Sequence, residues 1–221
     1  MRIPAKTMET VMEQILLQHG AEAENAALTA RIFTQSSVDG VYSHGVNRFS
    51  RLIGAVDRGV VDPKMRPGCT VGTVNAHLAM ERACDLAKEQ GMWLVALENT
   101  NHWMRGGTYG WQAADQGCIG ICWTNTMPNM PAWGSVEASA GNNPLVIAVP
   151  HSGAEHVVFD CAMSQFAYGR LEQARRRGEQ LPVPGGWDAQ GRLTTDPGAV
   201  EQPRRLLPMG YWKGSGLAVM L

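Results

Sequence analysis

The chain has 221 residues, of which 44% are apolar and 18% are charged, and its formal net charge is −1. This length allows one large domain or two small ones with a buried core, and the composition argues against intrinsic disorder. Because the net charge is close to zero, it gives no electrostatic reason to expect nucleic acid or an anionic membrane surface as a partner.

The first sixty residues predict three helices. Apolar side chains recur at helical spacing from Met8 to Leu16, and Gly20 is a suitable stop. An alanine-rich second helix should run from about Ala21 to Val38 and end at Asp39-Gly40. A third is set by the apolar period of residues 49–56, with Gly59 as its stop. We therefore expect an N-terminal helical domain over residues 1–62.

From residue 63 onwards, helices and strands are expected to alternate. The predicted helices span about 75–91, 108–117 and 164–177, and the predicted strands span about 92–99, 118–125, 144–150 and 156–160. Gly153 should lie in the turn between the last two strands, and residues 178–208 read as an irregular excursion. This order predicts an α/β domain over residues 63–221, with a sheet covered by helices.

The last stretch, GYWKGSGLAVML, reads as a glycine loop that opens an apolar helix. The chain stops within the first turns of that helix, so we expect it to be truncated at the C-terminus.

Cysteine usage and hydropathy indicate a compartment. Five scattered cysteines argue against a disulfide framework and for a reducing environment. Cys118 and Cys122 would share one face of a strand, which favours core packing over a metal site, and we predict no metal. The N-terminus lacks an apolar segment, and the longest aliphatic runs are too short to span a bilayer. We expect a cytoplasmic protein that does not enter a membrane.

The first candidate site lies in VYSHGVNR. Ser43 could cap the third helix, which would put His44 at its first position and Arg48 one turn later on the same face. A helix N-terminus lowers the pKa of a histidine. Arg48 could hold a carboxylate with two hydrogen bonds while His44 exchanges a proton with a neighbouring oxygen. The alternative that the spacing leaves open is a capped helix with a polar first turn and no catalytic role.

A second candidate is NHWMRGG. Asn101, His102 and Arg105 are expected between a strand end and a helix start, where open α/β sheets bind ligands. Gly106 and Gly107 would allow close backbone approach, and Thr108 could cap the helix. The alternative is a loop that packs its aromatic residues.

Two further stretches could contact a ligand. A strand leading into Asp160 would leave a carboxylate that needs a partner, either His44 or a cofactor, or that caps a helix. Lys213 lies among three glycines in MGYWKGSG. This stretch lacks the spacing of a Walker A loop, and no GxGxxG motif follows any predicted strand.

Several long stretches together resemble one family. GVYSHGVNRF, NHWMRGGTYGWQAA, GICWTN, NPLVIAVP, GRLEQARRRGEQLPVPGG and LLPMGYWKGSG are similar to the malate/L-lactate dehydrogenase type 2 oxidoreductases. The resemblance implies a mixed-sheet α/β fold of the L-sulfolactate/malate dehydrogenase type, which is not a Rossmann fold and needs no GxGxxG. It also implies reduction of a 2-keto acid, such as a 2-keto sugar acid, with NADH and less so with NADPH, by a homodimer.

The same resemblance implies roles for individual residues. His44 would donate the proton, Arg48 would hold the substrate carboxylate, and Asp160 would be a third catalytic residue. The residues that would line the substrate pocket are Ser43, His102 and Arg105. Those that would contact the dinucleotide are Asp160, Cys161, Ala162, Met163, Ser164, Trp212, Lys213 and Gly214.

Three departures from the family pattern leave other readings open. The resemblance implies that family members continue beyond Leu221, that this chain skips a short stretch near residue 72, and that GNNP stands where the family usually has threonine before Asn-Pro. The alternatives are a sibling 2-hydroxyacid dehydrogenase of the malate or lactate type and a non-catalytic, truncated remnant.

Overall fold

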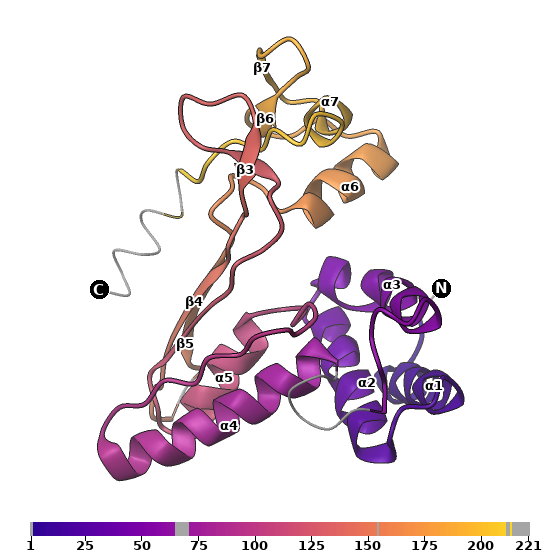
Figure 1. Cartoon of the computed structure of the whole chain (residues 1–221), viewed down its shortest axis with the longest axis vertical. Helices are drawn as coiled ribbons and strands as arrows, with labels where there is room; N and C mark the ends of the chain where they lie inside the picture. Colours follow the sequence, from indigo (N-terminus) through magenta and orange to yellow (C-terminus); the bar gives the residue numbers. More distant parts are fainter. Residues whose placement is uncertain (1, 65–70, 154, 211–212, 214–221) are drawn as a thin grey trace. The chain divides into compact units, whose positions relative to one another are not determined.

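A computed structural model describes residues 2–64, 71–153, 155–210 and 213. By their contacts, the residues form two compact units, which are described separately below (Figure 1). The first unit comprises Met1–Gly120 and Pro150–His156, and the second comprises Ile121–Val149 and Val157–Leu221. The domain boundary expected at residue 62 stays a prediction.

The first unit begins with three helices, as the sequence predicts. These are α1 (Ala5–Gln18), α2 (Ala23–Val38) and α3 (Val46–Asp57), with a short 3₁₀ helix, η1 (Tyr42–His44), between the last two. The helices α1 and α2 pack along each other (Figure 1). Their stops agree with the predicted glycines, because each helix ends within two residues of Gly20, Gly40 or Gly59.

Aromatic and aliphatic side chains hold these helices together. Phe33 of α2 is fully buried and meets Phe49 of α3 edge to face, with ring centroids 5.4 Å apart. Met12 and Leu16 of α1 belong to the same core, together with Val74 of the helix that follows α3 in the chain. The apolar periodicity of the sequence therefore corresponds to one contiguous core.

Two more helices, α4 (Gly72–Gln90) and α5 (Gly107–Asp115), belong to this unit. The stop predicted at Gly91 is confirmed, since its φ of +86° is a conformation that favours glycine. The strand predicted over residues 92–99 is wrong. A strand needs a neighbour that completes its hydrogen-bond ladder, and the described part of the chain offers none to this segment.

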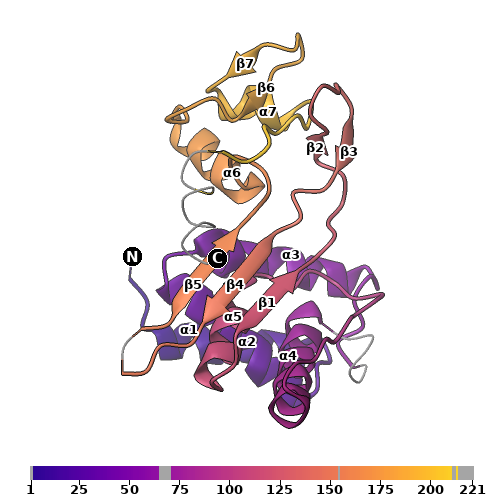
Figure 2. The same ribbon diagram turned by 90° about the vertical axis from the view of Figure 1, so that its left-hand side faces the viewer.

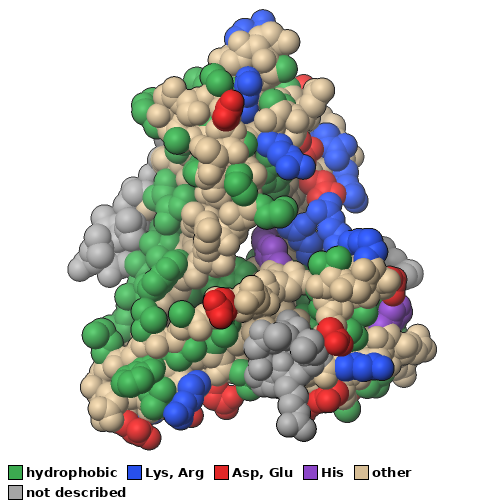
Figure 3. Space-filling view, in the orientation of Figure 1, with side chains coloured by type: hydrophobic (Ala, Val, Ile, Leu, Met, Phe, Trp, Pro, Cys, Tyr) green, Lys and Arg blue, Asp and Glu red, His purple; other side chains and the backbone are tan. Residues whose placement is uncertain are grey.

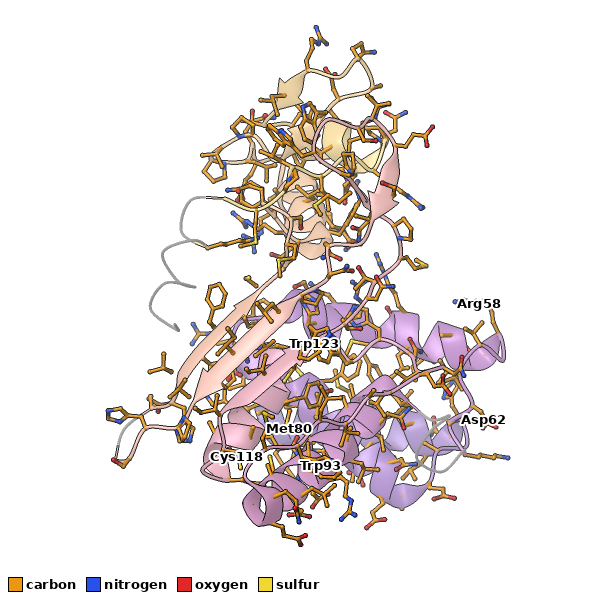
Figure 4. The ribbon with its side chains drawn as sticks, turned by 60° about the vertical axis from the view of Figure 1, so that its left-hand side comes forward. Arg58, Asp62, Met80, Trp93, Cys118 and Trp123 are labelled. Carbon is orange, nitrogen blue, oxygen red and sulfur yellow. The ribbon has the colours of Figure 1, made fainter. Side chains whose placement is uncertain are left out.

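Because no strand among the described residues lies beside this segment, several of its apolar side chains are exposed to solvent. Met92, Trp93, Leu94 and Leu97 are all exposed. Trp93 lies in the segment that follows α4 (Figure 4). The space-filling view shows apolar side chains at the surface around the end of that helix (Figure 3).

The second unit contains a three-stranded sheet in the order β1-β4-β5 (Figure 2). Its strands are β1 (Gly120–Trp123), whose first residue belongs to the first unit, β4 (Leu145–Val149) and β5 (Val157–Cys161). The strands β4 and β5 pair antiparallel over five residue pairs, from Leu145 opposite Cys161 to Val149 opposite Val157. The strands predicted over 118–125, 144–150 and 156–160 are therefore confirmed in type.

The rest of the second unit is more ordered than the sequence suggests. It contains the antiparallel pairs β2 (Met130–Pro131) with β3 (Ala138–Ala140) and β6 (Gly186–Trp187) with β7 (Leu193–Thr194), and the helices α6 (Tyr168–Arg177) and α7 (Pro197–Glu201).

The irregular excursion predicted over 178–208 is therefore wrong in part. Its apolar residues Leu181, Val200 and Leu206 bury against α6 and so fix the loop. The helix α6 starts at Tyr168 and not near residue 164. No helix of the described residues is long and apolar enough to cross a membrane.

We expect Phe33→Ala to lower the free energy of unfolding by about 3–5 kcal/mol, because it removes a buried ring and leaves a cavity beside Phe49. Urea denaturation followed by far-ultraviolet circular dichroism measures this change. Val11→Ala on α1, where the side chain is 48% exposed, is the matched control and should stay within about 0.5 kcal/mol of the parent. Equal losses in both variants would contradict the assignment of this core.

Candidate active site

Two histidines that the sequence singles out lie side by side in the first unit. The rings of His44 and His102 have their centroids 5.9 Å apart, with an angle of 46° between their planes. His44 ends η1, and His102 lies in the loop before α5. The positive charges of Arg48 and Arg105 both act on His44, and that of Arg48 acts on His102 as well. Four predicted residues thus gather at one place.

The local structure around His44 differs from the prediction. Ser43 does not cap α3, and His44 is not its first residue, because α3 begins at Val46 with Gly45 in the N-cap position. Ser43 Oγ instead lies 3.0 Å from His44 Nδ1, where either atom can be the donor. Arg48 is the third residue of α3, and its N–H donates to Gly45 O. The helix start therefore does not act on His44 in the predicted way.

The cap of α3 is supplied by a buried serine from the end of α2, which was not among the predicted site residues. Ser37 Oγ accepts a hydrogen bond from Val46 N–H at 2.9 Å and donates one to Phe33 O at 2.9 Å. Gly45 makes this contact possible, since a Cβ there would lie 2.2 Å from Ser37 Oγ and 2.9 Å from Phe33 O. In the sequence, this close approach of two helices is indicated only by the glycine that directly follows His44.

The loop that carries His102 is held by side chains and by the start of α4. His102 Nδ1 accepts a hydrogen bond from Met104 N–H at 2.8 Å, which leaves the proton of the neutral ring on Nε2. Asn75 Nδ2 of α4 donates to Thr100 Oγ1 at 2.7 Å. Gly72 lies so close to the loop that a Cβ would be 2.1 Å from Asn101 O. The loop backbone thus packs directly on α4.

Burial makes both histidines weak bases. The pKa of His44 is lowered to about 4, mainly by burial and in addition by the neighbouring His102, Arg48 and Arg105. The pKa of His102 is likewise lowered to about 4, mainly by burial and in addition by the charge of Arg48. Both rings are therefore neutral near pH 7. The remaining positive charges of the arginines make the place suitable for an anion.

Arg105 is fixed on two sides. Its Nη1 donates to Asp39 Oδ2 at the end of α2, and its guanidinium lies 4.7 Å from the ring centroid of Trp111. The aromatic packing considered as an alternative is also present, because Trp103 stacks on Tyr109 at 5.8 Å. Thr108 does not cap α5, which begins at Gly107 with Gly106 in the cap position.

The second unit carries the residues predicted to contact a dinucleotide. Asp160 lies within β5 opposite Val146 and does not end the strand, because Cys161 continues it. It does not cap a helix either, since Ala167 is the N-cap of α6. Met163 N–H donates to Asn142 O at 2.8 Å, and the fully buried Ser164 donates from Oγ to Phe166 O at 2.7 Å.

Lys213 is joined to this segment. It is buried, and its Nζ donates to the backbone oxygens of Ala162, at 2.7 Å, and Ser164. Burial lowers the pKa of the ammonium group. The predicted contacts Trp212 and Gly214 lie outside the described residues.

An open hollow of about 500 Å³ lies beside the same segment. It is lined by Trp123, Thr124, Asn125, Asn143, Leu145 and Met163 (Trp123 is labelled in Figure 4). Asn143 Oδ1 accepts a hydrogen bond from Thr126 N–H at 2.8 Å, and Thr126 Oγ1 donates to Asn142 Oδ1 at 3.0 Å. Thr126, Asn142 and Asn143 were not predicted as site residues, although the stretches TNT and GNN are rich in amide and hydroxyl side chains. Among the described residues, no group of three or more metal-ligating side chains is placed to hold an ion.

Comparison with known proteins defines the class of this chain as the dehydrogenases and reductases. The profile of the malate/L-lactate dehydrogenase family matches residues 3–221. The 2,3-diketo-L-gulonate reductase of Citrobacter koseri is 47% identical over 235 aligned positions, which cover all of this chain and 70% of the relative. The chain belongs to the malate/L-lactate dehydrogenase family.

Solved structures agree in fold. A dehydrogenase from Sinorhizobium meliloti superposes with a TM-score of 0.87 at 30% identity, covering 99% of this chain and 69% of that one. The sulfolactate dehydrogenase of Methanocaldococcus jannaschii gives a TM-score of 0.84 at 32% identity, covering 99% and 67%. The predicted fold, an α/β arrangement of the sulfolactate/malate dehydrogenase type, is therefore confirmed.

The comparison also shows what the relatives carry in addition. The alignment has 235 positions and this chain has 221 residues, a difference of 14. Within the aligned region the Citrobacter koseri relative therefore has residues that this chain lacks. The skip expected near residue 72 agrees with a difference of this kind, and its place in the chain stays a prediction.

We expect Ser37→Ala to destabilise the first unit by about 1–2 kcal/mol, because α3 loses its cap and Phe33 O loses a donor. Ser36→Ala is the matched control. Ser36 is also buried, but its Oγ has no hydrogen-bond partner among the described residues, so its loss should change stability by less than about 0.5 kcal/mol. Thermal unfolding of the two variants measures the difference, and an equal effect would contradict the capping role.

Stability should depend on pH through the two histidines. In the unfolded chain each binds a proton near pH 6.5, whereas the pKa of each in the folded chain is about 4. The unfolded state therefore binds more protons between these values, and stability falls as pH is lowered through this window, by roughly 1 kcal/mol per pH unit for each histidine. Urea denaturation at several pH values should show a flatter dependence for the double variant His44→Gln/His102→Gln. An unchanged slope would rule out burial of these rings as its cause.

Proposed function

We propose that the chain is part of an enzyme that reduces a 2-keto sugar acid, 2,3-diketo-L-gulonate, to 3-keto-L-gulonate with NADH. The observation that carries the proposal is the cluster of two neutral histidines with two arginines, in a chain 47% identical to a relative of that name. The cluster supplies groups that can move a proton and groups that can hold a carboxylate.

In this proposal Arg48 binds the substrate carboxylate and His44 gives the proton to the carbonyl oxygen. Neutral His44 is a poor acid, but an anion bound between it and the arginines would raise its pKa, because it offsets the positive charges that lower this pKa. Ser43 Oγ, in contact with Nδ1, fixes the direction of the ring, and the remaining nitrogen, Nε2, would face the substrate. His102 and Arg105 would line the pocket.

Membership of a dehydrogenase family implies a nicotinamide cofactor, which supplies the hydride when bound. Two observations in the second unit fit such a group. The hollow is bordered by amide side chains and by Met163, and Gln165 Oε1 is buried without a hydrogen-bond partner among the described residues. The residues that would hold the cofactor are Asp160, Cys161, Ala162, Met163, Ser164, Trp212, Lys213 and Gly214. NADH in preference to NADPH is part of the proposal, as are the catalytic role of Asp160, the homodimer and the cytoplasmic location.

A second candidate within the same class is a dehydrogenase for a sibling 2-hydroxy acid. It is favoured by the structural likeness to proteins named sulfolactate dehydrogenase, at 32% identity, and malate dehydrogenase from Entamoeba histolytica, at 27% identity. The third alternative is a non-catalytic remnant. The chain spans about 70% of the length of the curated relatives it matches. Oxidation of NADH with 2,3-diketo-L-gulonate, pyruvate or oxaloacetate as the second substrate separates the three.

The decisive variant is His44→Ala. We expect it to lower kcat by about 10²–10⁴-fold, the range that general acid catalysis contributes, while NADH binding, followed by its fluorescence, stays within about twofold. His151→Ala, which removes an exposed histidine of the same unit, is the control and should keep the parent activity. Full turnover by His44→Ala would refute the proton-donor role. Absence of turnover by the parent chain with every keto acid would instead support the remnant.

A further inference from the structure

Asp39 has contacts that its place at a helix end does not require. It is the C-cap residue of α2, which the sequence analysis interpreted only as a helix stop. Its Oδ1 accepts a hydrogen bond from Gln35 Nε2 at 2.8 Å, and its Oδ2 accepts one from Arg105 Nη1. Both carboxylate oxygens are therefore engaged, one by its own helix and the other by the candidate site.

The partner, Arg105, is the better buried of the two. The Arg105 side chain is 15% exposed and that of Asp39 is 32% exposed. Trp111 lies under the guanidinium at 4.7 Å and limits its movement from the other side. Arg105 is thus held as a partly desolvated cation whose charge is already matched within the protein.

The charges of the cluster can be added up. At neutral pH His44 and His102 carry no charge, Arg48 and Arg105 are positive, and Asp39 is negative. These five side chains leave one net positive charge. Arg48 is the arginine whose charge acts on both histidines, so its position suits the carboxylate next to the reacting carbonyl.

We propose that Asp39 determines substrate specificity, by occupying Arg105 so that the site accepts a keto acid with one carboxylate and disfavours one with two. A second substrate carboxylate would have to displace Asp39 from Arg105 or lie beside it, and either arrangement costs electrostatic free energy. The inference rests on the proposed function and narrows it, because it favours a sugar acid such as 2,3-diketo-L-gulonate over oxaloacetate.

The test compares two substrates that differ by one carboxylate, pyruvate and oxaloacetate. Asp39→Asn keeps the shape and the acceptor for Gln35 but removes the charge. We expect it to raise the ratio of kcat/KM for oxaloacetate to kcat/KM for pyruvate by about tenfold, mainly through a lower KM for oxaloacetate, as freeing one charge near a protein surface would do. Asp39→Glu, which keeps the charge, should retain the parent ratio.

Two further variants separate specificity from structure. Asp57→Asn removes a carboxylate of the same unit, which pairs with His19, and should leave the ratio unchanged. In Asp39→Asn/Arg105→Gln the gain for oxaloacetate should disappear, because the freed cation is gone. An unchanged ratio in Asp39→Asn, or an equal rise in Asp57→Asn, would overturn the inference, as would a gain that survives the loss of Arg105.

Failure of the proposed function would be visible separately. If the parent chain turns over no keto acid, the proposed function fails. The role of Asp39 is then tested by calorimetry, which measures the binding of oxamate, with one carboxylate, and of tartronate, with two. A rise of about tenfold in the relative affinity for tartronate on Asp39→Asn would still support the role of Asp39. An unchanged relative affinity, or no binding of either anion to parent or variant, would overturn it.

Discussion

The close contact between Gly45 and the end of α2 is the constraint on which the candidate site depends. Ser37 donates to Phe33 O within α2 and at the same time accepts the first free N–H of α3, and only a residue without a Cβ fits against this pair. The contact fixes where η1 ends and α3 begins. It therefore places His44 and Arg48, on either side of Gly45, relative to the same helix end that carries Asp39. The packing of α2 against α3 therefore also determines the positions of His44 and Arg48.

Burial, more than any helix dipole, gives the histidines their chemistry. His44 lies before α3 and not at its first position, yet its pKa is about 4, because desolvation and the neighbouring positive charges disfavour a second proton on the ring. His102 reaches the same state, with Met104 N–H occupying its Nδ1. Two neutral rings beside two arginines form a site with excess positive charge. An anion bound there would offset this charge and raise the pKa of His44, which would make it a better proton donor when substrate is present.

The sequence predicts best where one local period decides the structure. The apolar spacing of residues 8–16 and 49–56 and the short aliphatic runs around Val146 and Phe159 all correspond to observed elements. It fails where a distant group decides. Residues 92–99 have the composition of a strand but no partner among the described residues, and the cap of α3 comes from Ser37, nine residues before Val46. The site residues followed from the family resemblance, because spacing alone also allowed His44 to be interpreted as part of a capped helix.

The residues proposed for substrate and for cofactor belong to different units, and this division has a consequence for how activity can be lost. The proposed substrate residues depend on the helical core around Phe33; they are Ser43, His44, Arg48, His102 and Arg105. The proposed cofactor segment depends on the pairing of β4 with β5 and on Lys213, which donates to the backbone oxygens of Ala162 and Ser164. If these assignments hold, damage to the helical core around Phe33 should impair the proposed binding of the keto acid and leave the proposed dinucleotide contacts in place. Damage around Lys213 should do the reverse. A variant that binds only the keto acid or only the dinucleotide would thus show which of the two units keeps its native packing.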